Sequence, residues 1–311
     1  MTQSQVFYEK PHMLSLMSRK EFFIQRYGKL GWRFEETQPK QAIRINRMNT
    51  KEPAELIERL RSSGLMLQEI PFLTDGYWVT KSKFSVGATS EYLLGLYSIQ
   101  EAAAQIPATL FTQLKNKIVL DACAAPGGKT VQLADLMQNT GTIIAVDFKR
   151  ERIPALANQL ERCRVQNTIV YNLDARHAQK LETSFDCILL DMPCSGNFAT
   201  DKQWFENRTI HDVERNAKLQ RQLLKEAAQV LKPNGEIVYS TCSLEPEENE
   251  LSIDWALRNL ALRVEKVNCY GQDALTEIFG KHLDKSVENC RRIWPGPTQG
   301  FFVCKLRGVE S

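Results

Sequence analysis

Short apolar runs separated by polar turns repeat along the chain from Lys117 onward. Runs of this length suit strands that are buried on both faces of a parallel sheet. Between two of them, an amphipathic stretch predicts a helix that ends at Pro233-Asn234-Gly235. Strands that alternate with helices in this way indicate a doubly wound α/β sheet. The expected strands cover residues 118–120, 143–146, 185–190 and 235–239, and the expected helix covers about 213–231.

The pattern before residue 106 differs and predicts a smaller α+β module. A helix is expected over Pro53–Leu60, with proline in its first turn and Gly64 as its stop. A strand is expected at Gly76–Val79, after a turn. We therefore predict two domains, an N-terminal module over 1–106 and a sheet domain over 107–311.

Composition is that of a protein with a full hydrophobic core. The chain has 311 residues, 43% of them hydrophobic, and no apolar run of membrane-spanning length. Its first residues lack the pattern of a secretory signal. Its eight cysteines show no paired C-x-x-C spacing, which argues against a zinc site or a disulfide framework. We expect a cytoplasmic protein without a metal site.

Net charge is only +3, but it is unevenly distributed. Residues 1–110 contain 14 Lys and Arg against 11 Asp and Glu, and the remainder is balanced. Basic residues among aromatic ones are typical of a surface that contacts phosphates and stacks bases. The same aromatic residues would equally serve as the core of a small domain. They are Trp32, Phe34, Tyr77, Trp78 and Tyr92.

The first strand of the larger domain runs into Gly127-Gly128, and glycine lets a ligand approach the backbone closely. A phosphate loop needs glycine at position 123, which is cysteine here, and the dinucleotide fingerprint is absent. With these two motifs excluded, the expected ligand is a nucleoside without a pyrophosphate, such as S-adenosylmethionine. Asp147 ends the second strand, where a carboxylate can bind ribose hydroxyls, and Asp174 follows the third apolar run, where it could accept from an adenine amino group. Either acid could instead be a helix cap or turn residue.

Cys194 and Cys242 each follow the carboxyl end of an expected parallel strand, where open α/β sheets bind ligands. A single cysteine after a strand is usually a small buried hydrophobe. Two such cysteines, each in a short polar motif, indicate covalent chemistry on a nucleobase. The acidic run Glu245–Glu250 is expected to form the first turn of a helix. The other cysteines are expected to pack in the core: Cys123, Cys163, Cys187, Cys269, Cys290 and Cys304.

Three motifs in order, at 121–130, 191–196 and 239–250, resemble those of the Sun-type (NSUN) RNA cytosine-5 methyltransferases. Arg44-Ile45-Asn46, Gly95–Glu101 and Gly300–Val303 extend the resemblance over the chain, and the small archaeal tRNA members are most similar. The resemblance implies a Rossmann-like class I methyltransferase sheet with a smaller N-terminal RNA-binding module, and S-adenosylmethionine as cofactor. The cofactor residues that it implies are Ala122, Cys123, Ala124, Ala125, Pro126, Gly127, Gly128, Lys129, Asp147, Arg152, Asp174 and Asp191.

The same resemblance gives the catalytic residues their roles. Cys242 is implied as the nucleophile and Cys194 as the residue that assists product release. The opposite assignment would follow the DNA cytosine methyltransferases, where the Pro-Cys motif carries the nucleophile. Asp191 can hold the N3 and amino edge of cytosine, and protonated during addition it would offset negative charge on the ring. Lys129 is implied beside the target base.

RNA is the expected substrate, with tRNA first and rRNA as the alternative, and we expect a monomer. Arg44, Arg47 and Lys51 are the candidates for phosphate contact. An amino-group methyltransferase is expected to carry an Asn/Asp-Pro-Pro-aromatic motif where this chain has Asp191-Met192-Pro193-Cys194. A noncatalytic RNA-binding or ribosome-assembly factor is the third possibility, against which the retained motifs argue.

Overall fold

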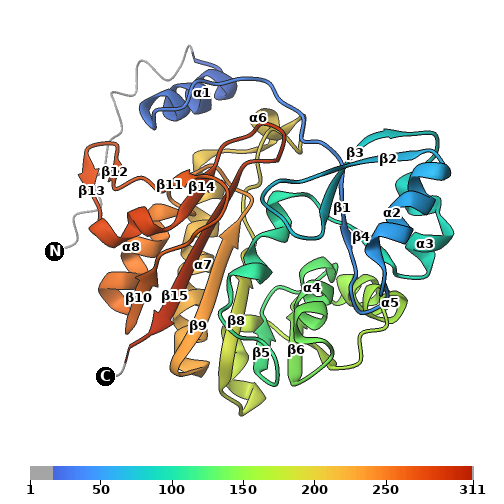
Figure 1. The fold of residues 1–311 in the computed structure, drawn as a ribbon. Coiled ribbons are helices and arrows are strands. Elements are labelled where there is room, and N and C mark those ends of the chain that lie inside the picture. The colour runs from blue at the N-terminus through green and yellow to red at the C-terminus, as the bar shows by residue number, and fades with distance from the viewer. Residues whose placement is uncertain (1–16, 310–311) are drawn as a thin grey trace.

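A mixed nine-stranded sheet forms the centre of the computed structural model, which describes residues 17–309 (Figure 1). Five of its strands are parallel and lie in the order β7-β6-β5-β8-β9. This order is that of a doubly wound α/β sheet, so the predicted fold class is confirmed. The five strands are β5 (Ile118–Asp121), β6 (Thr142–Asp147), β7 (Thr168–Asn172), β8 (Phe185–Asp191) and β9 (Leu231–Thr241).

The alternation of strands and helices expected from Lys117 onward does not continue beyond β9, where the sheet is extended by antiparallel strands. β15 (Phe301–Gly308) pairs with β9, and β10 (Leu262–Glu265) and β14 (Arg291–Ile293) both pair with β15. β11 (Gln272–Asp273) extends the edge beside β14, and β12 (Glu277–Ile278) and β13 (Lys281–His282) form a separate hairpin. A second difference is that Pro233-Asn234-Gly235 lies inside β9 rather than before it, because the strand begins directly after the preceding helix.

Helices cover both faces of the sheet (Figure 1). α4 (Gly128–Met137) and α5 (Ile153–Arg162) pack with β6 and β7 through one apolar cluster. The long helix α7 (Ile210–Val230) and α8 (Glu250–Asn259) pack on the other side through Leu223, Leu224 and Ile253. The helix expected over 213–231 is thus confirmed. None of the helices in residues 17–309 is long and apolar enough to span a membrane.

A separate antiparallel sheet of four strands, in the order β2-β3-β1-β4, forms the small module. Its strands are β1 (Ala42–Ile45), β2 (Leu65–Glu69), β3 (Gly76–Ser82) and β4 (Tyr97–Ile99), with helices α2 (Pro53–Ser62) and α3 (Ser90–Leu93). α2 begins at the expected proline, and Gly64 adopts the positive φ of a helix stop. Tyr77 and Trp78 are buried in this module, so they belong to its core and not to a base-stacking surface.

Helix α1 (Arg19–Lys29) lies apart from the small sheet, beside α6 (Trp204–Asn207) of the larger domain (Figure 1). Ser18 and Glu21 form a capping box at its start, and Phe23 meets Trp204 with ring centroids 4.7 Å apart. The domain boundary near residue 106 stays a prediction. Short 3₁₀ turns complete the fold: Val86–Ala88, Ala103–Gln105, Pro107–Leu110, Arg150–Arg152, Ala175–Leu181 and Lys285–Asn289.

Arg44 joins the small module to α4 and is not available to RNA. Its side chain is 4% exposed, and its Nη1 lies 2.8 Å from Asp135 Oδ2. The same carboxylate accepts hydrogen bonds from the backbone of Arg47 and Met48. The expected phosphate contact of Arg44 is therefore wrong. Arg47 is half exposed and pairs with Asp75, and Lys51 is exposed.

Candidate functional site

The two cysteines singled out from the sequence meet at the carboxyl ends of neighbouring strands. Cys242 directly follows β9, and Cys194 lies three residues beyond the end of β8. Their Sγ atoms are 3.1 Å apart, and both cysteines are free and partly exposed. The pKa of Cys194 is raised well above its ordinary value. The larger cause is the hydrogen bond with the Cys242 thiol, and the second is burial. Cys194 therefore keeps its proton at neutral pH and can donate it toward its neighbour.

Asp191 and Lys129 form an ion pair at the same edge of the sheet. Lys129 Nζ lies 2.7 Å from Asp191 Oδ2, and Ser240 Oγ donates to Asp191 Oδ1 over 2.8 Å. Burial lowers the pKa of Lys129, but the neighbouring Asp191 carboxylate more than offsets this, so its pKa is raised and the ammonium is kept. Both oxygens of Asp191 are thus oriented, and its side chain remains 31% exposed to receive a ligand.

Glu248 ties the two cysteine loops together, and sequence reasoning missed this role. Its carboxylate accepts from the backbone N of Ser195 over 2.9 Å and from Ser195 Oγ over 2.5 Å. Ser195 Oγ lies 3.1 Å from Ser243 Oγ, so the residues that follow both cysteines share one carboxylate. Burial raises the pKa of Glu248 to about 7, partly offset by the hydrogen bonds from Ser195.

Two buried amides fix the same loops from other directions. Asn197 Nδ2 donates to the backbone oxygen of Cys242 over 2.7 Å and to that of Gly300 over 3.1 Å. Gln220, on α7, donates to the backbone oxygen of Pro193 over 3.0 Å. These contacts span 27 to 103 residues of sequence, so no local pattern could have indicated them.

The acidic run after Cys242 does not form the first turn of a helix as expected. α8 begins only at Glu250, and Glu245, Glu248 and Glu250 are all fully buried. Arg26 of α1 pairs with Glu245 at 3.0 Å, and Arg292 of β14 pairs with Glu250 at 2.5 Å. The expectation was wrong because the partners that permit burial lie far away in the sequence.

The turn between β5 and α4 packs closely against α5 at Gly127 and is open at Gly128. Gly127 has φ of +105°, and an added Cβ there would lie 3.0 Å from Leu156 Cδ1. Beneath it Thr130 Oγ1 donates to Asp121 Oδ2 over 2.7 Å, while Oδ1 is buried without a partner. Burial raises the pKa of Asp121 to about 7. This turn contains the expected residues Ala122, Cys123, Ala124, Ala125, Pro126, Gly127 and Gly128.

Asp147 and Arg152 lie beside this turn, at the end of β6. The buried Asp147 carboxylate accepts from the backbone N of Ala125 over 3.1 Å and of Lys149 over 3.0 Å. Arg152 Nη1 lies 3.3 Å from the same carboxylate. Phe148 follows with 64% of its surface exposed, an aromatic face that sequence reasoning passed over. An exposed ring next to a strand-end carboxylate fits a nucleoside.

Asp174 lies at the end of β7, where it caps the turn Ala175–Leu181 by accepting from the backbone N of Arg176 over 3.0 Å. The Arg176 guanidinium pairs with the same carboxylate at 2.5 Å. The cap reading of Asp174 is therefore confirmed, and its contact with adenine stays a prediction. The structure brings Cys194, Cys242, Asp191 and Lys129 into one group and the glycine turn, Asp147 and Arg152 into a second beside it.

The strand order and the glycine turn are those of a Rossmann-like methyltransferase. The pair of cysteines at the strand ends indicates that its target is a nucleobase. Residues 108–307 match the family described as "16S rRNA methyltransferase RsmB/F". The chain belongs to this family of RNA cytosine-5 methyltransferases, which use S-adenosylmethionine.

The individual proteins that the chain resembles are also named as methyltransferases. The chain is 33% identical to the tRNA (cytosine(49)-C(5))-methyltransferase of Pyrococcus abyssi, over 91% of this chain and 94% of that protein. It is 34% identical to ribosomal RNA small subunit methyltransferase F of Aeromonas hydrophila, over 86% of this chain. A methyltransferase homologue from Pyrococcus horikoshii superposes with a TM-score of 0.85 and 36% identity, covering 97% of this chain and all of that one. The chain spans only 34–58% of the length of several rRNA methyltransferases that it matches.

Proposed function

We propose that this protein methylates carbon 5 of cytosine in RNA with S-adenosylmethionine, through a covalent adduct between a cysteine and carbon 6. The observation that carries the proposal is the 3.1 Å separation of the Cys194 and Cys242 sulfur atoms at the strand ends. Carbon 5 of cytosine is a poor nucleophile, and addition of a thiolate at carbon 6 makes it an enamine carbon. Covalent catalysis thereby divides one difficult step into two.

In the first stage the Cys242 thiolate forms a bond to carbon 6, and the ring electrons move toward N3. Asp191 binds the N3 and amino edge of the base, and a proton that passes from Lys129 through the Asp191 carboxylate to N3 offsets the charge on the ring. Lys129 and Ser240 hold the carboxyl group in place. Cys194 keeps its proton and can donate a hydrogen bond to the Cys242 sulfur, which stabilises the thiolate. This supports Cys242 as the nucleophile.

In the second stage a base, which Cys194 supplies or assists, accepts the proton on carbon 5, after which the bond between Cys242 and carbon 6 breaks. The electron pair of the carbon–hydrogen bond restores the ring double bond, and the thiolate departs. Cys194 lies at hydrogen-bond distance from the departing sulfur and can return a proton to it. A protein without Cys194 would therefore retain the adduct.

S-adenosylmethionine supplies an electrophilic methyl group when bound. The glycine turn leaves room for a nucleoside beside Gly128, where an added Cβ would meet nothing within 4 Å. The unpartnered Asp121 Oδ1 and the Asp147 carboxylate offer acceptors, and Phe148 offers a ring face. These residues fit the cofactor, and Arg152 holds Asp147 in position.

For substrate we propose tRNA, with rRNA as the alternative. The relative from Pyrococcus abyssi, named for tRNA, is matched over 94% of its length, whereas the F-type rRNA methyltransferase of Aeromonas hydrophila is matched over 58%. The target base must leave its stack to reach the cysteines. We further propose that the module before residue 106 holds the RNA, with exposed Lys51 among its contacts.

We propose that the protein acts as a monomer. All eight cysteines are free, which fits a reducing compartment such as the cytoplasm.

The test compares wild type, Cys242→Ala and Cys194→Ala with unmodified tRNA and methyl-labelled S-adenosylmethionine. We expect wild type to label carbon 5 of cytosine, Cys242→Ala to lose both methyl transfer and adduct, and Cys194→Ala to accumulate a denaturation-resistant protein–RNA adduct. An adduct in Cys242→Ala would reverse the two roles. Labelling of rRNA but not tRNA would favour the alternative substrate.

A noncatalytic role is tested in the same experiment. A wild-type protein that binds RNA but not S-adenosylmethionine, measured by calorimetry, would contradict the proposed activity. Full activity of Cys242→Ser would instead favour an amino-group methyltransferase.

A further inference from the structure

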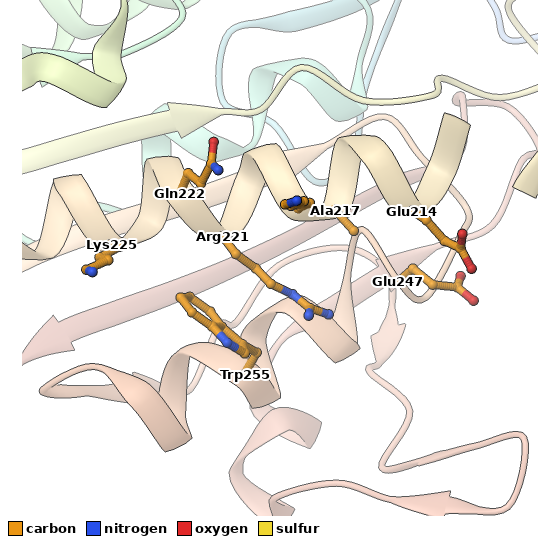
Figure 2. A pocket seen from close by; sticks show the side chains of 8 residues that line it. Glu214, Ala217, Arg221, Gln222, Lys225, Glu247 and Trp255 are labelled. Atoms are coloured by element: carbon orange, nitrogen blue, oxygen red, sulfur yellow. The ribbon is translucent and has the colours of Figure 1, made fainter. Parts of the chain in front are cut away.

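A groove of about 490 Å³ lies between α7 and α8, on the surface of the larger domain. Figure 2 shows Arg221 reaching from α7 toward Trp255 of α8, with Lys225 at one end of the groove and Glu247 at the other. Lys218 also lines it. None of the catalytic or cofactor residues described above lines this groove, so its lining requires a separate explanation.

Arg221 is a cation without an acceptor. Its Nε is buried without a hydrogen-bond partner, and residues 17–309 give its guanidinium neither a hydrogen bond nor an ion pair. The guanidinium carbon lies 5.9 Å from the centre of the Trp255 ring, which is its one aromatic contact among those residues. Burial lowers the pKa of Arg221, and attraction from Tyr239, Glu247 and Asp254 does not offset this. A buried donor without an acceptor is costly, and a bound anion would remove that cost.

The acidic residues of the groove attract this cation from a distance but, among the described residues, form no ion pair with it. Glu247 pairs with Arg26 of α1 at 2.7 Å, and Glu214 lies 3.3 Å from His211. Lys218 and Lys225 are exposed and, within the described part of the chain, form no ion pair. They follow the spacing i and i+7 on α7, with Arg221 between them, so all three point to one side of the helix. The groove therefore has unused positive charge.

We propose that this groove binds a phosphate group, held by Arg221 with Lys218 and Lys225 around it. A phosphate carries several acceptor oxygens and can satisfy the forked guanidinium and both ammonium groups together. The phosphate can come from free inorganic phosphate or from the backbone of bound RNA. The second source rests on the proposed function, whereas the first does not.

Two residues that line the groove, Arg221 and Glu247, are next in sequence to residues that hold the cysteine loops. Gln220 precedes Arg221 and donates to the backbone oxygen of Pro193 over 3.0 Å. Glu247 precedes Glu248, whose carboxylate binds Ser195 over 2.9 Å. Two residues that line the groove, one on α7 and one in the turn before α8, are thus sequence neighbours of side chains that position the catalytic loops.

The first experiment titrates inorganic phosphate into the full-length protein by calorimetry, with chloride at equal ionic strength as the blank. Arg221→Gln is the test variant. Arg215→Gln is the matched control, because Arg215 lies on the same helix, is 75% exposed and pairs with Asp212 outside the groove. We expect wild type and Arg215→Gln to bind phosphate, and the Kd of Arg221→Gln to be at least about tenfold higher.

The second experiment measures tRNA binding against salt for the same three proteins. If the phosphate belongs to RNA, Arg221→Gln will lower the slope of log K against log salt by about 0.7–0.9, the value of one phosphate contact. An unchanged slope with weakened phosphate binding would instead assign the groove to the free anion. Equal phosphate binding by Arg221→Gln and Arg215→Gln overturns the proposal.

Lys225→Gln is a second test variant, for use if Arg221→Gln does not fold. Lys225 is exposed, so its substitution leaves the packing of α7 intact, and we expect it to raise the phosphate Kd about threefold. Methylation of a short single-stranded RNA by these variants separates the inference from the proposed function. Activity in that assay with lost phosphate binding supports the groove, and inactivity of wild type itself contradicts only the proposed function.

Discussion

Glu248 and Ser195 are joined by two hydrogen bonds, one from the backbone N of Ser195 over 2.9 Å and one from its Oγ over 2.5 Å. Ser195 follows Cys194 and also contacts Ser243, which follows Cys242. Among the described residues, neither Lys nor Arg pairs with Glu248, whereas Arg26 and Arg292 pair with its buried neighbours in sequence. One carboxylate without a counterion therefore sets the relation between the two thiols.

Substitution of Glu248 by Gln should lower kcat about 10- to 100-fold, the value of a hydrogen bond to a charged group. The glutamine amide cannot accept from Ser195 at both positions, so the cysteine loops lose their shared anchor. Because Glu248 does not contact RNA in the proposed mechanism, KM should change little. Steady-state methylation kinetics measure both. Glu288→Gln, at an exposed position, is the control, and an unchanged kcat in Glu248→Gln would contradict the positioning role.

The pKa of Glu248, raised from 4.5 to about 7 by burial, predicts how stability depends on pH. Between these values the folded protein binds a proton that the unfolded chain has released, so the free energy of unfolding falls as pH rises, by up to about 3 kcal/mol. Glu248→Gln has no such proton. Urea unfolding of both proteins from about pH 5 to about pH 8 should therefore give a difference that changes across this range. Curves of unfolding free energy against pH that run parallel for the two proteins would refute the raised pKa of Glu248. Asp121 is present in both proteins, so its own titration cancels in the difference.

Lys129→Met should reduce kcat about 10- to 100-fold by removing the cation that orients Asp191. Asp191 would keep only its hydrogen bond from Ser240. Lys232→Met is the matched control, because Lys232 pairs with Asp186 at 2.9 Å near the opposite end of the same strand. Its loss should cost no more than about 1 kcal/mol of stability and leave kcat unchanged. Equal kcat values for the two variants would contradict a role of Lys129 at the base.

The sequence predicted the parallel part of the sheet because buried parallel strands are continuous apolar runs. The runs at 118–120, 143–146, 185–190 and 235–239 correspond to β5, β6, β8 and β9. β14 was not predicted, since its three residues Arg291–Ile293 carry two arginines that are held by distant acids. Strands this short are defined by their neighbours rather than by their own pattern.

At the site, the sequence indicated the side chains to which the proposed mechanism assigns chemistry, and missed those that position them. Cys194, Cys242 and Asp191 occur in short motifs after apolar runs, a local signal. Glu248, Asn197 and Gln220 act through contacts across 27 to 103 residues, and an acidic run after a strand is locally the same as an exposed helix start. Burial of an acid depends on partners that only the fold brings together.

Arg44→Ala should destabilise the protein by about 3–5 kcal/mol, because it leaves Asp135 buried without its partner. Arg47→Ala removes a half-exposed pair and should cost no more than about 1 kcal/mol. Urea unfolding measures both. If Arg44 contacted RNA instead, Arg44→Ala would be stable and would lower the salt dependence of RNA binding, the reverse of this prediction.

Mild oxidation should join Cys194 and Cys242 in a disulfide and stop methylation. Their sulfur atoms are 3.1 Å apart and must approach by about 1 Å to reach bonding distance. Diamide takes up the two thiol hydrogens as the bond forms, and dithiothreitol should reverse the reaction and restore activity. Peptide mass spectrometry identifies the linked pair. Cys194→Ala should form no such link, and the buried pair of Cys290 and Cys304 should stay reduced because the oxidant cannot reach it. Inactivation without this disulfide would show that the two thiols do not approach each other in solution.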